Sequence, residues 1–377
     1  VAHERAHAMI LTLLLLGCVH RAPEGPPVTE SAPLQLGPEA RTIIEAAAAD
    51  LDVGVRRRAL ALLVEADPAP AGGTWASRGR YDPSPYVQRA VAEALGRRHD
   101  PASLDTLRAW VEDAAADPWV RGAAALALAR TPGEQARLAK AAASARSGAS
   151  ALLLAATIAG DGDARARLRR TIESGNLPME LWFLAALGES GQDELAGPLA
   201  AVIDLVEPEI RLPVARAAWR LGAPAGEKAL ADAVAGTDED VGLEAVEFLA
   251  DRPEALPLLS GAAGTEIVGS AAAITRFGLG GGDLKSVVAA LEGSDGDLAL
   301  FAARAAARRL AAEPTLSGAE RIRGAIRASL EDAAPGVVLQ AVPILAGGGP
   351  TDREALRGLL SHESADVRVE AALALGG

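Results

Sequence analysis

The sequence predicts an all-α fold, an α-solenoid of about eleven stacked helix pairs. A short amphipathic pattern of apolar residues recurs along nearly the whole chain with a period near 30 residues. Residues that cap helix N-termini recur together with it. One helix pair cannot bury its own apolar face, whereas stacked pairs bury a continuous core.

The clearest copy of the pattern begins at Asp117 and runs to about Arg130. Asp117 is a good N-cap, because its carboxylate accepts hydrogen bonds from the first free backbone N–H groups of a helix. Pro118 suits the first helical position, where its missing N–H costs nothing. The apolar residues that follow share one face of the helix: Val120, Ala124, Ala127 and Leu128.

The same spacing returns in ten further copies, which would form the second helix of each pair. These copies begin at Val55, Val87, Ala151, Leu181, Ile210, Val241, Ile267, Leu298, Val338 and Val367. The copies at Leu181 and Ile267 fit the pattern poorly. In six of the eleven copies an N-cap residue stands three positions before the start: Asp52, Ser84, Asp117, Asp238, Asp295 and Ser364.

Further helical segments lie between these copies and would supply the first helix of each pair. They cover residues 102–113, 133–143, 164–174, 193–206, 225–235, 283–292, 318–332 and 351–361. We expect the segment 318–332 to be a longer first helix, because the step from Leu298 to Val338 is 40 residues.

A short motif, Asp-x-x-Val-Arg, marks the start of the second helix. It is complete at residues 52–56 and 117–121 and partial at 210–211 and 364–368, while Gln88, Gly242 and Ala299 replace the arginine elsewhere. With this motif the chain resembles the HEAT-repeat family, in particular the short, armadillo-type HEAT-like repeats, over about residues 36–377. The resemblance implies a superhelix that displays a concave surface, lined by the second helices, to another protein or peptide.

The first 37 residues are of a different kind. Residues 9–16 form a short apolar run that ends in Leu15-Leu16-Gly17-Cys18. This resembles the lipobox of bacterial lipoprotein signal peptides, which implies cleavage before Cys18 and lipidation of that residue. We therefore divide the chain into a signal peptide (1–18), a Pro-rich tether (19–37) and a HEAT-like solenoid (38–377).

The same resemblance implies a place in the bacterial cell envelope. Since Val19 rather than Asp follows the cysteine, the outer membrane is favoured, with the repeats in the periplasm or at the cell surface. Two alternatives stay open: Cys18 could be an ordinary apolar residue, or the start could be assigned wrongly, which would make the protein a cytoplasmic adaptor.

Composition excludes several functional classes. The formal net charge is −13, so nucleic-acid binding is not expected without a concentrated basic face. Cys18 is the single cysteine, which excludes disulfides and cysteine-ligated metal sites. Neither a His-x-x-x-His pair, a nucleophile elbow nor a P-loop occurs. We therefore expect no metal, no cofactor and no catalytic residue.

One irregular stretch is the candidate partner-binding site. Between Val64 and Tyr86 the expected first helix is displaced by residues 67–83, which are rich in Pro, Gly and Arg and contain two aromatic residues. Loops of repeat arrays lie on one edge and often carry function, and Trp, Tyr and Arg are enriched in binding hot spots. The residues we select are Trp75, Arg78, Arg80 and Tyr81. The alternative is that Trp75 packs against the neighbouring pair.

Together these observations predict a non-enzymatic, lipid-anchored scaffold of the bacterial envelope. Its partner would be another protein or peptide bound on the solenoid surface, and Cys18 would hold it to the membrane. The alternative from a different class is an enzyme subunit, since some HEAT-like arrays resemble subunits that attach bilin chromophores.

Overall fold

The computed structural model describes residues 34–144, 150–176, 180–330 and 333–376. Every regular element in these ranges is a helix, which confirms the all-α prediction. The signal peptide, Cys18 and most of the Pro-rich tether lie outside the described residues. The chain divides into two units, an N-terminal unit of residues 34–223 and a C-terminal unit of Pro224–Leu375, which we describe separately.

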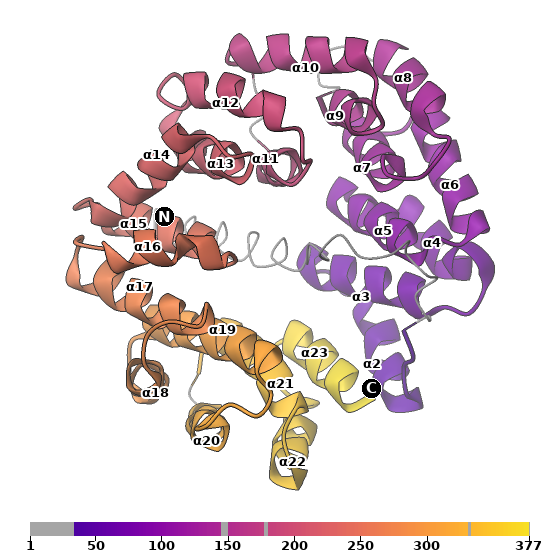
Figure 1. Cartoon of the computed structure of the whole chain (residues 1–377). Coiled ribbons are helices and arrows are strands. Elements are labelled where there is room, and N and C mark those ends of the chain that lie inside the picture. Colours follow the sequence, from indigo (N-terminus) through magenta and orange to yellow (C-terminus); the bar gives the residue numbers. More distant parts are fainter. Residues whose placement is uncertain (1–33, 145–149, 177–179, 331–332, 377) are drawn as a thin grey trace. The chain divides into compact units, whose positions relative to one another are not determined.

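The N-terminal unit contains six helix pairs. Its helices are α2 (Pro38–Ala47), α3 (Val53–Ala66), α4 (Gly73–Arg80), α5 (Pro85–Arg98), α6 (Pro101–Glu112), α7 (Pro118–Leu128), α8 (Gln135–Ser144), α9 (Ser150–Ile158), α10 (Gly162–Glu173), α11 (Leu181–Gly188), α12 (Ala196–Val202) and α13 (Pro208–Arg220). Short 3₁₀ turns, η1 (Pro70–Gly72) and η2 (Asp193–Leu195), precede α4 and α12. The odd-numbered helices pack on one another from α3 to α9, and α11 packs on α13; the even-numbered helices lie on the outer side of these (Figure 1).

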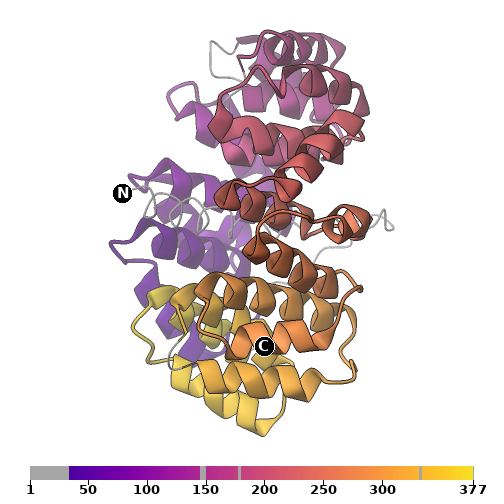
Figure 2. The same ribbon diagram turned by 90° about the vertical axis from the view of Figure 1, so that its left-hand side faces the viewer.

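The C-terminal unit contains five pairs on the same plan. Its helices are α14 (Pro224–Ala235), α15 (Glu239–Leu249), α16 (Leu256–Ser260), α17 (Glu266–Gly278), α18 (Leu284–Glu292), α19 (Gly296–Ala312), α20 (Ala319–Ser329), α21 (Pro335–Ala346), α22 (Pro350–Leu359) and α23 (Ala365–Gly376). The turn η3 (Pro253–Ala255) precedes α16. Helix α19 packs on α17 and α21, and α20 packs on α18 and α22; Figure 2 shows these helices in orange and yellow. Each predicted copy thus falls on an odd-numbered helix, α3 to α23.

The apolar pattern is confirmed most clearly at its second position. The residue four places after the start is buried in every copy that fits well; these residues are Ala59, Val91, Ala124, Ala155, Val214, Ala245, Ala302, Val342 and Ala371. Small residues here let neighbouring helices approach closely. A Cβ added at Gly278 would lie 2.9 Å from the Cα atom of Ala305, so glycine is required where α17 crosses α19.

Several details differ from the predictions. Val241 is 37% exposed, and Ala346 is exposed. The buried face of α17 begins at Val268 rather than Ile267, because the hydroxyl of the N-cap Thr265 accepts from the N–H of Val268. The long element between residues 296 and 346 is the second helix α19, with 17 residues, whereas the first helix α20 has 11.

The N-cap predictions are partly confirmed. Asp52, Asp117, Asp238 and Asp295 each accept a hydrogen bond from a backbone N–H of the first turn. The Ser84 side chain makes no such bond. The backbone N–H of Ser84 instead donates to Asp82 Oδ1 at 2.9 Å, so the Asp82 carboxylate orders the turn before α5.

Candidate partner-binding site

The stretch 67–83 is not the irregular loop that its composition predicts. It contains the turn η1 and the complete first helix α4, which packs on α3 and α5. Ala71, Gly72 and Gly73 have positive φ angles, so the chain makes a left-handed turn before α4 begins. The glycines mark this turn and do not indicate the absence of a helix.

Trp75, Arg78, Arg80 and Tyr81 all lie on α4 and at its C-terminal end, and arginine–aromatic contacts join them in pairs. The Arg78 guanidinium lies 5.8 Å from the ring centroid of Trp75. The Arg80 guanidinium lies 5.8 Å from the ring of Tyr81 and equally far from the ring of Trp110 on α6. Contacts of this kind are worth about 0.5–1 kcal/mol at exposed sites.

The four residues differ in how far they are exposed to solvent. Trp75 and Arg80 are half-buried, whereas Arg78 is exposed and Tyr81 is 79% exposed. Arg80 Nη2 also lies 3.1 Å from Asp113 Oδ2 at the end of α6. Arg80 therefore has three neighbours, Asp113 and the rings of Trp110 and Tyr81.

Arg98 at the C-terminal end of α5 holds the segment that leads into α4. Its Nη1 donates to the carbonyl oxygens of Val64 (2.7 Å) and Asp67 (2.6 Å), and its Nη2 donates to that of Ala69 (2.9 Å). Its Nε donates to Asp100 Oδ2 at 2.8 Å. One side chain thus ties α3, the turn before α4 and the N-cap of α6 together.

A row of aromatic residues lies at the N-terminal ends of the inner helices. The position of Trp119 and Trp182 on repeating helices indicates core or ridge residues, but their contacts with each other could not be predicted from the repeat pattern. The Tyr86 ring on α5 stacks edge-on against Trp119 on α7, with centroids 5.9 Å apart. Trp119 in turn lies 6.5 Å from Trp182 on α11, which reaches past α9. The buried Arg89 lies 5.2 Å from the Trp182 ring. The aromatic residues of three pairs therefore meet, although they are far apart in sequence.

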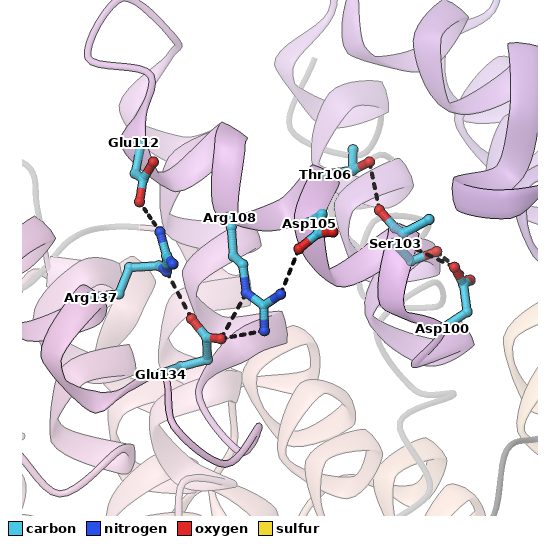
Figure 3. Close-up of polar contacts among 9 residues, drawn as sticks. Asp100, Ser103, Asp105, Thr106, Arg108, Glu112, Glu134 and Arg137 are labelled. Carbon is cyan, nitrogen blue, oxygen red and sulfur yellow. Dashed lines mark hydrogen bonds and ion pairs between the residues drawn. The ribbon is translucent and has the colours of Figure 1, made fainter.

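The outer helices are joined by ion pairs instead. Figure 3 shows the carboxylate of Glu134, which is 4% exposed, between Arg108 and Arg137. Arg108 Nη2 lies 2.6 Å from Glu134 Oε1, and Arg137 Nε lies 3.0 Å from Glu134 Oε2. Arg137 also pairs with Glu112 at the end of α6. This network connects α6 to α8 around a buried carboxylate, so we assign it to stability.

The C-terminal unit carries a second charged group, on its inner helices. Arg304 on α19 reaches across α17 to Glu247 on α15, with Nη1 and Oε1 3.0 Å apart. Burial first, and the nearby Glu247 second, raise the pKa of Glu244 to about 7. Among the described residues, neither Glu244 Oε1 nor Arg304 Nη2 finds a hydrogen-bond partner. The Arg304–Glu247 pair thus joins α15 to α19.

Among the described residues, no group of three or more His, Cys, Asp and Glu could hold a metal ion. No helix in those ranges is long and apolar enough to cross a bilayer. What the structure offers is a partly exposed cluster of arginine and aromatic side chains on α4 and at its C-terminal end.

Comparison with known families gives one match: residues 75–159 match HEAT repeats. This confirms the family resemblance over helices α4 to α9 and the fold class. A search of curated proteins finds no match.

Solved structures give wider but distant likenesses. The CpcE–CpcF complex of phycocyanin lyase from Nostoc sp. PCC7120 matches with 16% identity and a TM-score of 0.36, over 82% of this chain and 98% of that one. Human deoxyhypusine hydroxylase matches with 16% identity and a TM-score of 0.28, over 89% and 96%. Importin beta matches with 13% identity and a TM-score of 0.38, over 90% of this chain and 60% of that one.

The first two matches contradict the prediction that the chain is not an enzyme, because proteins of this helical architecture include part of a lyase and a hydroxylase. At these identities and scores the likeness shows the fold alone, and it assigns no activity to this chain.

Proposed function

We propose that this chain, which contains HEAT repeats, is an interaction scaffold that binds a partner protein on the surface around α4. The observation that carries the proposal is the state of Tyr81: its ring is 79% exposed, yet Arg80 lies against it. Arg80 is itself held by Asp113 and lies near the Trp110 ring.

A held aromatic residue suits binding for an energetic reason. Association costs about 0.5–1.5 kcal/mol for each flexible side chain that becomes fixed. Because Arg80 already contacts the Tyr81 ring, part of this ordering cost is met before a partner binds. Tyr, Trp and Arg are also the residue types that dominate binding energy at interfaces.

A photo-reactive amino acid at position 81 tests the proposal in cells that express the native protein. We expect covalent capture of a partner protein, and we expect the Trp75→Ala variant to reduce this capture. Leu205 provides the matched control position, because it is 76% exposed and lies in the turn between α12 and α13. Equal capture from positions 81 and 205 would refute a partner site at α4.

We further propose that Cys18 carries a lipid anchor in the bacterial envelope. The support is the apolar run that ends in Leu15-Leu16-Gly17-Cys18 and the Pro-rich residues after it. The Cys18→Ala variant should then leave the membrane fraction, and the N-terminal peptide of the native protein should begin at a lipidated cysteine. Unchanged fractionation of Cys18→Ala would contradict the anchor.

A further inference from the structure

Exposed large apolar side chains concentrate at two successive turns of the N-terminal unit. Among the described residues, seven large apolar side chains are exposed. Four of them lie in or beside the α2–α3 and α4–α5 turns: Leu51 (96%), Val53 (39%), Tyr81 (79%) and Tyr86 (44%). An exposed apolar cluster rimmed by polar residues is typical of an interaction site.

The hydrogen bonds of Arg56 place the two turns side by side. Arg56 Nη1 donates to the carbonyl oxygen of Leu51 at 3.2 Å, and Arg56 Nε donates to Asp82 Oδ2 at 2.7 Å. Leu51 and the residue after Tyr81 therefore contact the same guanidinium. The edge-on contact between Tyr86 and Trp119 continues the surface to the third pair.

The arginine side chains at this surface have partners within the chain, whereas three of the carboxylates form no ion pair in the part of the chain that the structure describes. The arginines are engaged: Arg56 pairs with Asp82, Arg80 pairs with Asp113, and Arg121 donates to the carbonyl oxygen of Val111. Three carboxylates, Asp50, Asp52 and Asp117, make no ion pair that we find in the described residues and accept only backbone hydrogen bonds. Asp50 and Asp52 share the Arg56 guanidinium with Asp82 through longer-range attraction, which leaves the three turns with more negative than positive charge. Arg78, on the outer side of α4, lies over Trp75.

We propose that these residues form one docking surface for a segment of the partner protein that carries lysine or arginine beside large apolar side chains. This turn surface consists of Leu51, Val53, Tyr81, Tyr86, Asp50, Asp52 and Asp117. The apolar side chains would be buried by the partner, and the three carboxylates would face its cations. The inference rests on the proposed function and specifies the chemistry of the partner.

The charge also argues against two other occupants. A second copy of this chain brings a net charge of −13, so it would present mostly carboxylates to carboxylates. An anionic bilayer would meet Asp50, Asp52 and Asp117 with the same sign. A basic, apolar protein segment is the occupant that satisfies both the apolar side chains and the carboxylates.

Two fluorescently labelled synthetic peptides test this inference by fluorescence anisotropy with the full chain. Both consist of leucine with one tryptophan, and they differ only in carrying lysine or glutamate at the polar positions. We expect the lysine peptide to bind at least about tenfold more tightly than the glutamate peptide, and we expect its binding to weaken with added salt.

Variants then locate the binding. The Asp50→Asn, Asp52→Asn, Asp117→Asn triple variant keeps side-chain oxygens that can cap a helix, and it should weaken the lysine peptide about tenfold. The Leu51→Ser, Tyr81→Ser variant should weaken it by a similar factor. The charge-matched control is Glu227→Gln, Glu254→Gln, Glu292→Gln, all exposed in the C-terminal unit, and Leu205→Ser is the control for exposed apolar area. Neither control should change the affinity.

Each other outcome overturns the inference. Failure of both peptides to bind, or equal losses in the variants and their controls, would show that the turn surface does not select a basic segment. Dimerisation through Leu51 and Tyr81, or binding of these residues to anionic vesicles, would assign the surface to a different occupant. Capture at position 81 of a partner through an acidic segment would overturn the inference and leave the proposed function standing, whereas absence of specific capture would contradict the proposed function itself.

Discussion

The guanidinium of Arg56 lies 2.7 Å from the carboxylate of Asp82, and this pair joins the turn of the first helix pair to the turn of the second. Arg56 is the arginine of the repeat motif, and its Nη1 also donates to the carbonyl oxygen of Asp50 at 2.7 Å. The motif arginines of other pairs act on the same kind of acceptor. Arg121 donates to Val111 O and Arg368 to His362 O, near the C-terminal ends of α6 and α22.

Gln88 stands at the position of the motif arginine in the second pair and also donates to a backbone carbonyl oxygen. Its Nε2 donates to the carbonyl oxygen of Asp82 at 2.7 Å, just after α4 ends. The motif residue thus satisfies a free carbonyl group at the turn within its own pair. Arg56 does more than this, because it also pairs with Asp82 of the neighbouring helix pair.

The Arg56→Met variant should lower the free energy of unfolding of the N-terminal unit by about 3 kcal/mol. Both side chains are largely buried, and removal of one partner leaves the Asp82 carboxylate without its cation. Urea unfolding followed by circular dichroism measures the loss. The control is Arg41→Met, which removes an exposed pair with Glu45 and should cost less than about 1 kcal/mol. Equal losses in the two variants would contradict the assigned role.

Replacement of Arg98 by methionine should loosen α4 in particular. The variant keeps the apolar stem but leaves the carbonyl groups of Val64, Asp67 and Ala69 without their donor. Each buried group left unsatisfied costs about 1–3 kcal/mol. Hydrogen exchange measures the effect: amides of residues 73–80 should exchange faster, while those of α9 should not change. Uniform acceleration across the N-terminal unit would point to global destabilisation instead.

The lowered pKa of Asp100 makes the free energy of unfolding depend on pH in the acidic range. Burial opposes its ionisation, but hydrogen bonds from Ser103 and Arg98 outweigh burial and lower its pKa to about 2, from 3.8. The unfolded chain therefore binds the proton first as the pH falls. The stabilisation, about 2 kcal/mol, is complete above pH 4 and is lost between about pH 4 and pH 2. The Asp100→Asn variant should lack this dependence when unfolding is measured across that range.

Glu244 should act in the opposite direction, in the C-terminal unit. Its folded-state pKa is raised from 4.5 to about 7, so below pH 4.5 it is protonated in both states and has no effect. As the pH rises from 4.5 to 7, the unfolded chain loses the proton while the folded chain keeps it, and stability falls. The Glu244→Gln variant should therefore match the wild type near pH 4 and exceed its stability at pH 8 by about 2–3 kcal/mol.

A pH-independent difference between Glu244→Gln and the wild type would contradict this assignment. The Glu247→Gln variant provides the comparison. Because the Glu247 carboxylate pairs with Arg304, its loss should lower the free energy of unfolding at pH 8.

Sequence reasoning identified the repeats because their signals are local. The apolar spacing and the Asp caps depend on residues within one helix, so Ala124 and Asp117 reveal their roles without knowledge of any neighbour. It failed for residues 67–83, because Pro, Gly and Arg there resemble a loop. The helix α4 forms because α3 and α5 supply its apolar contacts and Arg98 satisfies the chain before it.

Apart from α4, the sequence by itself determined the helices, their pairing and the all-α stack, since 3.6-residue periodicity and capping act over a few residues. The tertiary structure alone decided which side chains meet. Only stacking brings Tyr86 to Trp119, Arg80 to Asp113 and Arg56 to Asp82, because each partner belongs to the next pair, about 30 residues away. The exposed ring of Tyr81 is likewise a product of that stacking, since the neighbours that bury or hold a residue lie on other helices.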